Sequence, residues 1–442
     1  MAKVQKIKTV ATAKADNFLH STATQLGQTD PAPTASEKRT DTTIYKIEEF
    51  LKAQYNFRYN TVKNQIEYKT ITDSSWSCCD EITTNGIECA IMREGLKNVK
   101  NTLHTLLTTS QKYDPITGYL ESLPPWDGKD HIKKLASFVR MPVAQRTWFD
   151  VNFEKHLVRT LACATGRIPF NKQIFTLISG QNDGKTTFLR FLVPPAWRDL
   201  FTEDIDFDSK DGLVSVAQNV FIILDELSAL RRSEINTVKS MVSKDTVKAR
   251  LPYDKQPTNL KRRASFFAST NTDEFLTDET GNVRWLCFKI LGVNHDDGGP
   301  NGYNKNINIH KVWAQAYSLL QTPDYRHQLT AAELIQSEET NQSHTKKGAE
   351  YEAILTNMKN DDSGVFMTAS AIKKRLEEHP FNYKLAATEY VGRACVQLNW
   401  KKVSKRVDGK PLYGYMVLVL DEKSTSEGPI LGQNTYYEKT PF

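Results

Sequence analysis

One segment near the middle of the chain has the residue types of a phosphate-binding loop. The apolar run Ile174–Ile178 leads into the segment Ser179–Thr187, which ends in Gly-Lys-Thr-Thr. An order of strand, glycine-containing loop and helix gathers backbone N–H groups and a helix N-terminus around one point, which then attracts an anion. Lys185 is expected to reach the β- and γ-phosphates of a nucleoside triphosphate, and the Thr186 hydroxyl to bind Mg²⁺. The sequence therefore predicts ATP and Mg²⁺ as ligands of this loop.

The loop departs from the usual pattern at one position. That pattern has a glycine five residues before Gly184, where this chain has Ser179. We expect the neighbouring Gly180 to supply the permissive backbone instead. The residues predicted to surround the phosphates are Gly180, Gln181, Asn182, Asp183, Gly184, Lys185, Thr186 and Thr187. The alternative is a structural strand–turn–helix that leaves Lys185 exposed.

Two acids end a second apolar run. Val220–Leu224 is followed directly by Asp225 and Glu226. A buried parallel strand is typically a continuous apolar run, and residues at its carboxyl end lie at the crevice where α/β sheets bind ligands. We expect Asp225 to hold Mg²⁺, directly or through water, and Glu226 to polarise the water that attacks the γ-phosphate. The alternative for Asp225 is a helix N-cap.

Two more polar residues follow a third predicted strand. The strand Ser265–Thr270 ends at Asn271, and Arg284 follows a short polar stretch. Asn271 is predicted to orient the attacking water or to sense the γ-phosphate, and a turn or N-cap role is its alternative. Arg284 is predicted to reach the triphosphate of a neighbouring subunit and to stabilise charge on the transferring phosphoryl group. Its alternative is a surface ion pair with Asp278 or Glu279.

These segments, in this order and spacing, carry a family resemblance. The chain resembles the virulence-associated E family of mobile-element proteins, which is similar to the superfamily 3 helicases and the poxvirus-type primase-helicases. The matching segments are Ser122–Gly128, Ser179–Thr187, Ile222–Glu226, Val238–Lys255, Phe267–Asn271 and Gly281–Trp285. The resemblance implies an AAA+-like P-loop ATPase that forms a ring-like homo-oligomer and acts on DNA. It also implies the phosphate-loop, acidic, sensor and arginine-finger roles for Lys185, Thr186, Asp225, Glu226, Asn271 and Arg284.

A basic segment lies between the second and third predicted strands. Residues 234–255 begin with helical spacing and end in a basic stretch that contains an aromatic residue. Superfamily 3 rings place a hairpin here that projects into the central channel, and this segment looks like it. Single-stranded DNA in such a channel would meet phosphate-binding cations and one stacking ring, namely Lys244, Lys248, Arg250, Lys255 and Tyr253. The alternative is a solvated charged loop.

Composition sets only broad bounds. A chain of 442 residues holds two or three domains, and its net charge of +6 permits an acidic polymer as partner without arguing for one. No apolar run approaches the length of a membrane span, and the first residues do not resemble a secretory signal. The six cysteines lack zinc-site spacing, so we expect reduced thiols in a cytoplasmic protein.

The part that precedes the loop divides into three segments. Residues 1–40 are polar and predict a mobile tail. Residues 41–110 predict a small accessory domain without a catalytic constellation, with a helix over 44–55, a strand over 65–71 and helical spacing over 88–107. Residues 111–172 predict a helical segment whose core includes Trp126, Trp148, Phe149 and Phe153. His156, Arg159 and Arg167 in that segment have packing and surface roles, or contact adenine or a neighbouring subunit.

The ATPase core is predicted over residues 173–295 and is followed by three segments. Residues 296–348 predict a helical extension, with polar residues 337–348 as a linker. Residues 349–422 resemble a winged helix, with Thr368 capping a helix over 369–379, a second helix over 387–397, and a hairpin of 400–407 with 413–420. Its basic residues, Lys401, Lys402, Lys405, Arg406 and Lys410, contact DNA phosphates, or the domain serves ring assembly. Residues 423–442 predict a polar tail.

Together these features predict a Mg²⁺-dependent ATPase of a phage, plasmid or genomic-island replication system that moves on single-stranded DNA. A nucleotide-switched DNA-binding or defence module without unwinding activity shares every motif. A small-molecule P-loop kinase is a third possibility, against which the basic hairpin and the C-terminal domain argue.

Overall fold

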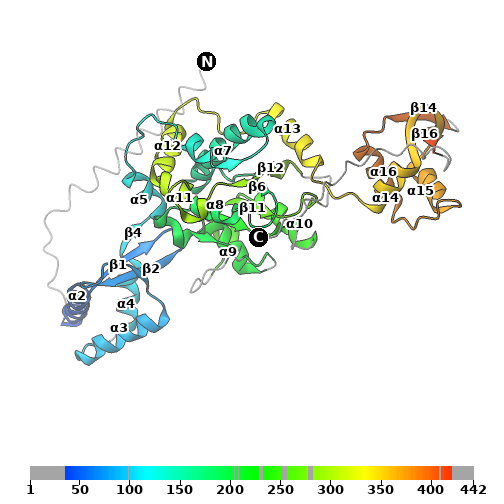
Figure 1. The fold of residues 1–442 in the computed structure, drawn as a ribbon. Coiled ribbons are helices and arrows are strands. Elements are labelled where there is room, and N and C mark those ends of the chain that lie inside the picture. Colours follow the sequence, from blue (N-terminus) through cyan, green and yellow to red (C-terminus); the bar gives the residue numbers. More distant parts are fainter. Residues whose placement is uncertain are drawn as a thin grey trace, which may run out of the picture. The chain divides into compact units, whose positions relative to one another are not determined.

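The computed structural model describes residues 35–97, 99–203, 205–207, 209–227, 232–249, 256–276, 282–407 and 410–420 (Figure 1). The chain forms two compact units, which divide between Asp114 and Pro115. Within the described ranges, no helix is long and apolar enough to cross a membrane.

The N-terminal unit is a four-stranded sheet with helices on one face. Its elements are α2 (Ala35–Gln54), β1 (Tyr55–Asn60), β2 (Gln65–Thr70), β3 (Ser77–Cys78), α3 (Glu81–Arg93), α4 (Val99–Thr108) and β4 (Gln111–Tyr113). The strand order is β3-β2-β1-β4, with β4 parallel to β1 and the other pairs antiparallel. Phe57 and Ile66 of the sheet pack against buried residues of the three helices, among them Leu51, Ile91 and Leu103.

Two predictions for this unit need correction. Helix α2 begins at Ala35, inside the segment predicted to be a mobile tail, while residues 1–34 of that tail lie outside the described residues. The helical spacing of residues 88–107 belongs to two helices, because α3 ends at Arg93 and Gly95 follows with a φ of 78°, in the left-handed region that a helix cannot continue.

The second unit is built on a five-stranded parallel sheet. Its strands are β6 (Ile174–Ile178), β7 (Phe201–Thr202), β8 (Phe221–Leu224), β11 (Ser265–Thr270) and β12 (Trp285–Lys289). The order is β12-β6-β11-β8-β7, and every pair is parallel. All residues of β6, β8 and β11 are buried, which explains the nearly continuous apolar sequences of β6 and β8; β11 adds three buried hydroxyl residues, Ser265, Ser269 and Thr270. Strands β11 and β12 come last in the chain among these five, and they flank β6. Strand β11 therefore lies between β6 and β8.

Helices and small sheets surround this sheet. The helices are α5 (Pro115–Ser122), α6 (His131–Ala136), α7 (Val143–Ala164), α8 (Lys185–Phe191), η1 (Pro195–Leu200), α9 (Lys210–Gln218), α10 (Arg232–Val242), η3 (Asn282–Arg284), η4 (Asp296–Gly298), α11 (Tyr303–Asn306), α12 (Ile309–Gln321) and α13 (Ala331–Gln342). Two antiparallel pairs complete it: β5 (Val139–Arg140) with β13 (Gly292–Val293), and β9 (Thr246–Ala249) with β10 (Thr258–Lys261).

The predicted helical core is correct in part. Phe149 and Phe153 of α7 are fully buried and stack on each other with ring centroids 5.5 Å apart. Trp126 was wrongly placed in the core, because its ring is exposed and its Nε1 donates to the Lys129 carbonyl at 2.7 Å. His156 and Arg159 are fully buried, so they have packing roles in this chain.

The segment predicted as a polar linker is packed instead. Helix α13 continues to Gln342, and its buried Ser337 and Asn341 both donate to the Trp285 carbonyl, at 3.1 and 2.9 Å. Thr345 then forms a bridge with Leu276. These residues are polar because they satisfy backbone groups of the core, not because they lie in solvent.

The C-terminal part of the second unit combines three helices with a three-stranded sheet. Its elements are α14 (Ala349–Asn357), β14 (Met358–Met367), α15 (Ala369–Glu377), α16 (Thr388–Gln397), β15 (Lys402–Val407) and β16 (Lys410–Val419), with strand order β14-β16-β15. Thr368 caps α15, since its Oγ1 accepts from the Ala371 N–H at 3.2 Å. The turn residues Asp408 and Gly409 lie outside the described residues.

Candidate nucleotide site

The predicted phosphate loop connects β6 to α8. Helix α8 begins at Lys185, and Gly184 precedes it in the left-handed conformation, with a φ of 79°. Asn182 also has a positive φ, of 65°. Gly180, which was expected to supply the unusual backbone, is not among the residues with positive φ, so the tight turn is made two and four residues later.

The Lys185 ammonium lies inside its own loop. Its Nζ donates to the carbonyl and hydroxyl oxygens of Ser179, both at 3.2 Å, and to the Gly180 carbonyl at 2.5 Å. The side chain is buried, and this burial lowers the pKa of Lys185 against the opposing effect of Asp183, Asp225 and Glu226. Ser179 therefore adds a hydroxyl acceptor for Lys185 at the place where the usual pattern has glycine.

The Asp225 carboxylate accepts hydrogen bonds from hydroxyl groups of two other elements, α8 and β11. Its Oδ1 accepts from Thr186 Oγ1 at 2.8 Å and from Ser269 Oγ, and the two hydroxyls lie 3.3 Å apart. The Glu226 N–H also donates to Oδ1, at 3.0 Å. Burial raises the pKa of Asp225, but the bonds from Ser269 and Thr186 outweigh it and hold the pKa below its usual value. Three oxygen-bearing side chains thus meet at one point, which is the donor set that Mg²⁺ prefers.

Asn271 bridges the lysine and the second acid. Its Oδ1 accepts from Lys185 Nζ at 2.9 Å, and its Nδ2 lies 3.1 and 3.0 Å from the two carboxylate oxygens of Glu226. Glu226 has a φ of 54°, a left-handed conformation that is uncommon for a residue with a Cβ and that typically costs about 1–3 kcal/mol. The exposed Glu226 carboxylate is thereby held close to the loop.

The strand order explains why these side chains meet. Thr270 of β11 pairs with Ile178 of β6, and Ala268 pairs with Leu224 of β8. Because β11 lies between β6 and β8, Asn271 emerges between the loop and the two acids. The structure thus brings together five of the predicted residues: Lys185, Thr186, Asp225, Glu226 and Asn271.

Ser269 is a site residue that sequence reasoning missed. The sequence places it only inside the third predicted strand. The signal was available, because side chains two apart on a strand share a face, and Ser269 is two residues before Asn271.

Arg284 lies away from this cluster. It directly precedes β12, whose first residue Trp285 pairs with Ile174, the first residue of β6. Arg284 is therefore at the amino edge of the sheet, whereas the cluster is at the carboxyl edge. Its Nε donates to Ser243 Oγ at 2.8 Å. Asp278 and Glu279, the alternative ion-pair partners, lie outside the described residues.

The predicted basic hairpin is described in part. Strands β9 and β10 pair antiparallel, with Lys248 opposite Asn259. Lys244 and Lys248 are exposed, while Val247, Ala249 and Leu260 pack against α9. The other three predicted DNA contacts, Arg250, Tyr253 and Lys255, lie outside the described residues.

A buried arginine fixes the base of this hairpin. Arg262 follows β10, and its Nη2 donates to the carbonyls of Asn171 and Ala264, both at 3.1 Å, while Nη1 donates to the Val242 carbonyl. Burial lowers the pKa of Arg262 to about 10. The hairpin therefore starts from a rigid point at the amino edge of the parallel sheet.

The fold and the cluster define the class of protein: a mixed α/β protein whose parallel sheet carries lysine, hydroxyl, carboxylate and amide groups at its carboxyl edge. Residues 120–346, just over half of the chain, match the virulence-associated protein E-like domain. The chain belongs to this family, as the resemblance predicted. Among curated proteins, none matches the chain.

Solved structures resemble the chain at low sequence identity. The apo structure of the NrS-1 C-terminal region aligns with 85% of this chain and 99% of that one, at 12% identity and a TM-score of 0.50. The A form apo structure of the same region aligns over the same shares with a TM-score of 0.48 and 12% identity. SCCmec type IV Cch, described as an active helicase, aligns over 84% of this chain and 93% of that one, at 10% identity and a TM-score of 0.35. The first of these likenesses supports the fold alone, and it agrees with the predicted α/β class.

Proposed function

We propose that the protein is a cytoplasmic Mg²⁺-dependent ATPase that moves on single-stranded DNA in the replication system of a mobile element. The observation that carries this proposal is the hydrogen-bonded cluster at the carboxyl edge of the sheet. Through the Asn271 amide, it joins a lysine at a helix N-terminus to the Glu226 carboxylate. Membership of the virulence-associated protein E-like family supports the biological setting.

The cluster assigns a task to each side chain. In the nucleotide-bound protein, Lys185 exchanges its bonds to Ser179 and Gly180 for phosphate oxygens, with the α8 N-terminus behind it. Thr186, Asp225 and Ser269 fit Mg²⁺, which neutralises developing charge when it is bound.

Hydrolysis also needs an activated water. The Glu226 carboxylate accepts hydrogen bonds from Asn271 and is exposed, so it is available to orient a water and to accept its proton. Asn271 couples the position of the Lys185 ammonium to that of the Glu226 carboxylate, because one amide forms hydrogen bonds with both side chains. This is the geometry expected of a sensor residue, and it ties the acid to the presence of phosphate at Lys185.

The motor part of the proposal rests on the opposite edge of the sheet. Arg284 directly precedes β12 and lies at the amino edge of the sheet, opposite its own cluster, so an arginine-finger role requires a neighbouring copy and therefore a ring-like homo-oligomer. Lys244 and Lys248 are exposed near the start of the β9–β10 hairpin, where they are available to DNA phosphates. The C-terminal α15–α16–hairpin arrangement is proposed as a winged-helix-like domain, with Lys401, Lys402, Lys405 and Arg406 exposed.

The test is ATP hydrolysis with and without single-stranded DNA, for wild type, Lys185→Ala and Glu226→Gln. Glu338→Gln on the exposed side of α13 is the matched control. We expect DNA-stimulated hydrolysis in wild type and control, and its loss in both site variants. An ATP hydrolysis rate that is the same with and without DNA would favour a nucleotide switch or a small-molecule kinase. ATP binding without hydrolysis in wild type would refute the ATPase.

A further inference from the structure

The sheet of the N-terminal unit has a polar face opposite its helices. Phe57 of β1 and Ile66 of β2 pack on the helical core. Because side chains alternate along a strand, Arg58 and its cross-strand partner Glu67 lie on the other face. Tyr113 shares this face, since it pairs with Asn60, two residues after Arg58.

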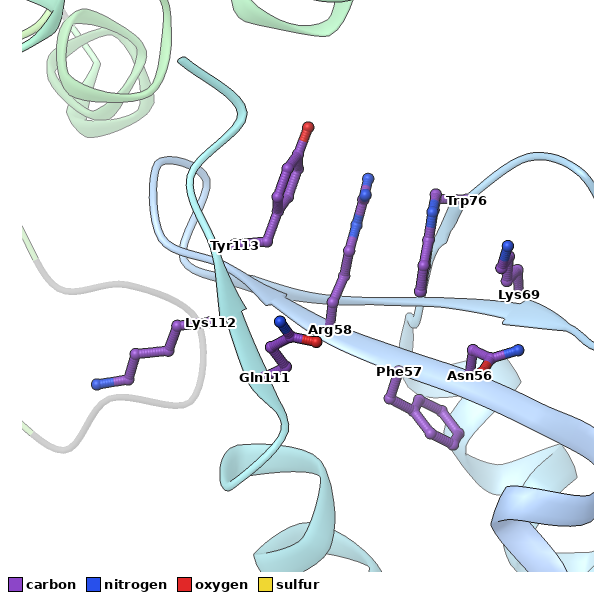
Figure 2. Close-up of a pocket in the computed structure, with 8 residues that line it drawn as sticks. All are labelled: Asn56, Phe57, Arg58, Lys69, Trp76, Gln111, Lys112 and Tyr113. Atoms are coloured by element: carbon purple, nitrogen blue, oxygen red, sulfur yellow. The ribbon is translucent and has the colours of Figure 1, made fainter. Parts of the chain in front are cut away.

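A row of stacked side chains stands on this face. Figure 2 shows Tyr113, Arg58 and Trp76 side by side, with Lys69 beyond Trp76. The Arg58 guanidinium carbon lies 3.9 Å from the ring centroid of Tyr113 and 4.2 Å from that of Trp76. Lys69 Nζ lies 5.1 Å from the same Trp76 centroid. Rings and cations therefore alternate along the row, which four separate strands and loops assemble.

Hydrogen bonds to the Glu67 carboxylate hold Arg58, the centre of this row, in place. Arg58 donates through Nε and Nη2 to the Glu67 carboxylate, at 2.6 Å each, and Asn60 Nδ2 donates to the same carboxylate at 2.6 Å. The Arg58 side chain is 22% exposed, so its planar group is fixed and still reachable from solvent. A ligand would therefore meet an arginine that is already ordered.

The row also lines a shallow hollow. Its volume is about 410 Å³, and Arg58, Lys69, Trp76 and Tyr113 are among its lining residues. Aromatic rings beside basic groups are the chemistry with which proteins bind unpaired bases and their phosphates. A double helix hides its base faces and offers this surface only phosphates.

We infer that this face binds single-stranded nucleic acid, with one base stacking on the face of Tyr113 opposite Arg58, a second base displacing Lys69 from the Trp76 ring, and phosphates contacting Arg58 and Lys69. The site lies wholly within residues 56–113 and uses none of the residues of the proposed motor. It gives the accessory unit a function of its own: holding a single strand independently of the nucleotide state.

The test is fluorescence anisotropy of the full chain with labelled oligo-dT of about 20 nucleotides, in the absence of ATP. All proteins carry Lys248→Ala, to reduce binding by the proposed hairpin. Trp76→Ala and Tyr113→Ala remove the rings, Trp76→Phe keeps a stacking face, and Tyr45→Ala removes an aromatic that is 60% exposed on α2. Oligo-U and a DNA duplex of the same length separate RNA, single-stranded DNA and duplex binding.

We expect each alanine variant on the sheet to weaken oligonucleotide binding about tenfold, Trp76→Phe to retain most of it, and Tyr45→Ala to bind as the parent does. Photocross-linking with an iodouracil-substituted strand should label peptides that contain Trp76 or Tyr113. Unchanged affinity in both alanine variants, tighter binding of duplex, or cross-links confined to other segments would overturn the inference. Loss of ATPase activity in the Glu226→Gln protein leaves this binding intact, so the two proposals fail separately.

Discussion

Asn271 offers the sharpest test of the proposed chemistry, because a single amide joins the two charged groups of the site. Its hydrogen bonds to Lys185 and Glu226 are 2.9 to 3.1 Å long. A hydrogen bond to a charged group contributes roughly 1.5–3 kcal/mol. If one such contact acts in the transition state, Asn271→Ala lowers kcat by roughly 10- to 150-fold, which corresponds to about 1.5–3 kcal/mol.

The aspartate variant separates the two halves of the amide. Asn271→Asp keeps an oxygen that accepts from Lys185 and removes the N–H donor to Glu226. We expect it to be as impaired as the alanine variant at neutral pH, since two carboxylates then face each other. As pH falls, the pair takes up a proton and the donor returns, so kcat of the aspartate variant should recover relative to that of the alanine variant.

The assay is steady-state phosphate release over a range of ATP concentrations, at several pH values from about 5.5 to 9. The bridging role predicts a change in kcat with KM altered by less than about threefold, because Lys185 and the α8 N-terminus, and not Asn271, are proposed to hold the phosphates. A kcat within twofold of wild type in both variants would refute the reasoning. A loss that appears only in KM would make Asn271 a binding residue.

Three further predictions follow from the same structure. Mixing Arg284→Ala with Lys185→Ala protein should restore hydrolysis that neither shows alone, since an intact arginine would then face an intact loop; no recovery on mixing would contradict action between subunits. Ser269→Ala removes one of the hydroxyl bonds at Asp225, so the Mg²⁺ concentration for half-maximal activity should rise several-fold, with the Mg²⁺ titration as the readout. Burial, with Arg159 next, lowers the pKa of His156 well below its usual value. Since the folded protein keeps this ring neutral while the unfolded chain protonates below about pH 6.5, each pH unit below that costs about 1.4 kcal/mol of unfolding free energy. His156→Gln should flatten that loss in urea titrations at pH 7 and 5.5, and an unchanged slope would contradict it.

The parts of the fold that could be predicted are those in which burial leaves a mark on the sequence. Strands β6 and β8 are buried along their whole length, and their sequences are almost entirely apolar; β11 is buried as well and has Phe266, Phe267 and Ala268 at its centre. Polar residues at their carboxyl ends were therefore recognisable. What the sequence did not contain was the strand order, and it is the position of β11 between the other two that puts Asn271 beside both Lys185 and Glu226.

The errors have physical causes as well. The polar composition of residues 337–348 predicts a linker. In the structure, however, Ser337 and Asn341 are buried, and both donate hydrogen bonds to the Trp285 carbonyl. The row on the N-terminal sheet was missed because Trp76 and Tyr113 come from loops and strands far apart in the chain. Each residue alone has no distinctive pattern, and only the pairing of β1 with β2 and β4 brings them to Arg58.

The separation of the two edges of the parallel sheet has a consequence for the proposed motor. The nucleotide cluster is at the carboxyl edge, whereas Arg284 and the base of the hairpin are at the amino edge. Arg284 bonds Ser243, the residue immediately before the exposed Lys244. Under the proposed function, the same arginine that reaches a neighbour's phosphate is thus in contact with the segment that carries the DNA-facing lysines. A change in the Arg284–Ser243 bond is then the shortest route by which hydrolysis in one subunit moves the hairpin of the next. Ser243→Ala would accordingly slow DNA-stimulated hydrolysis more than basal hydrolysis.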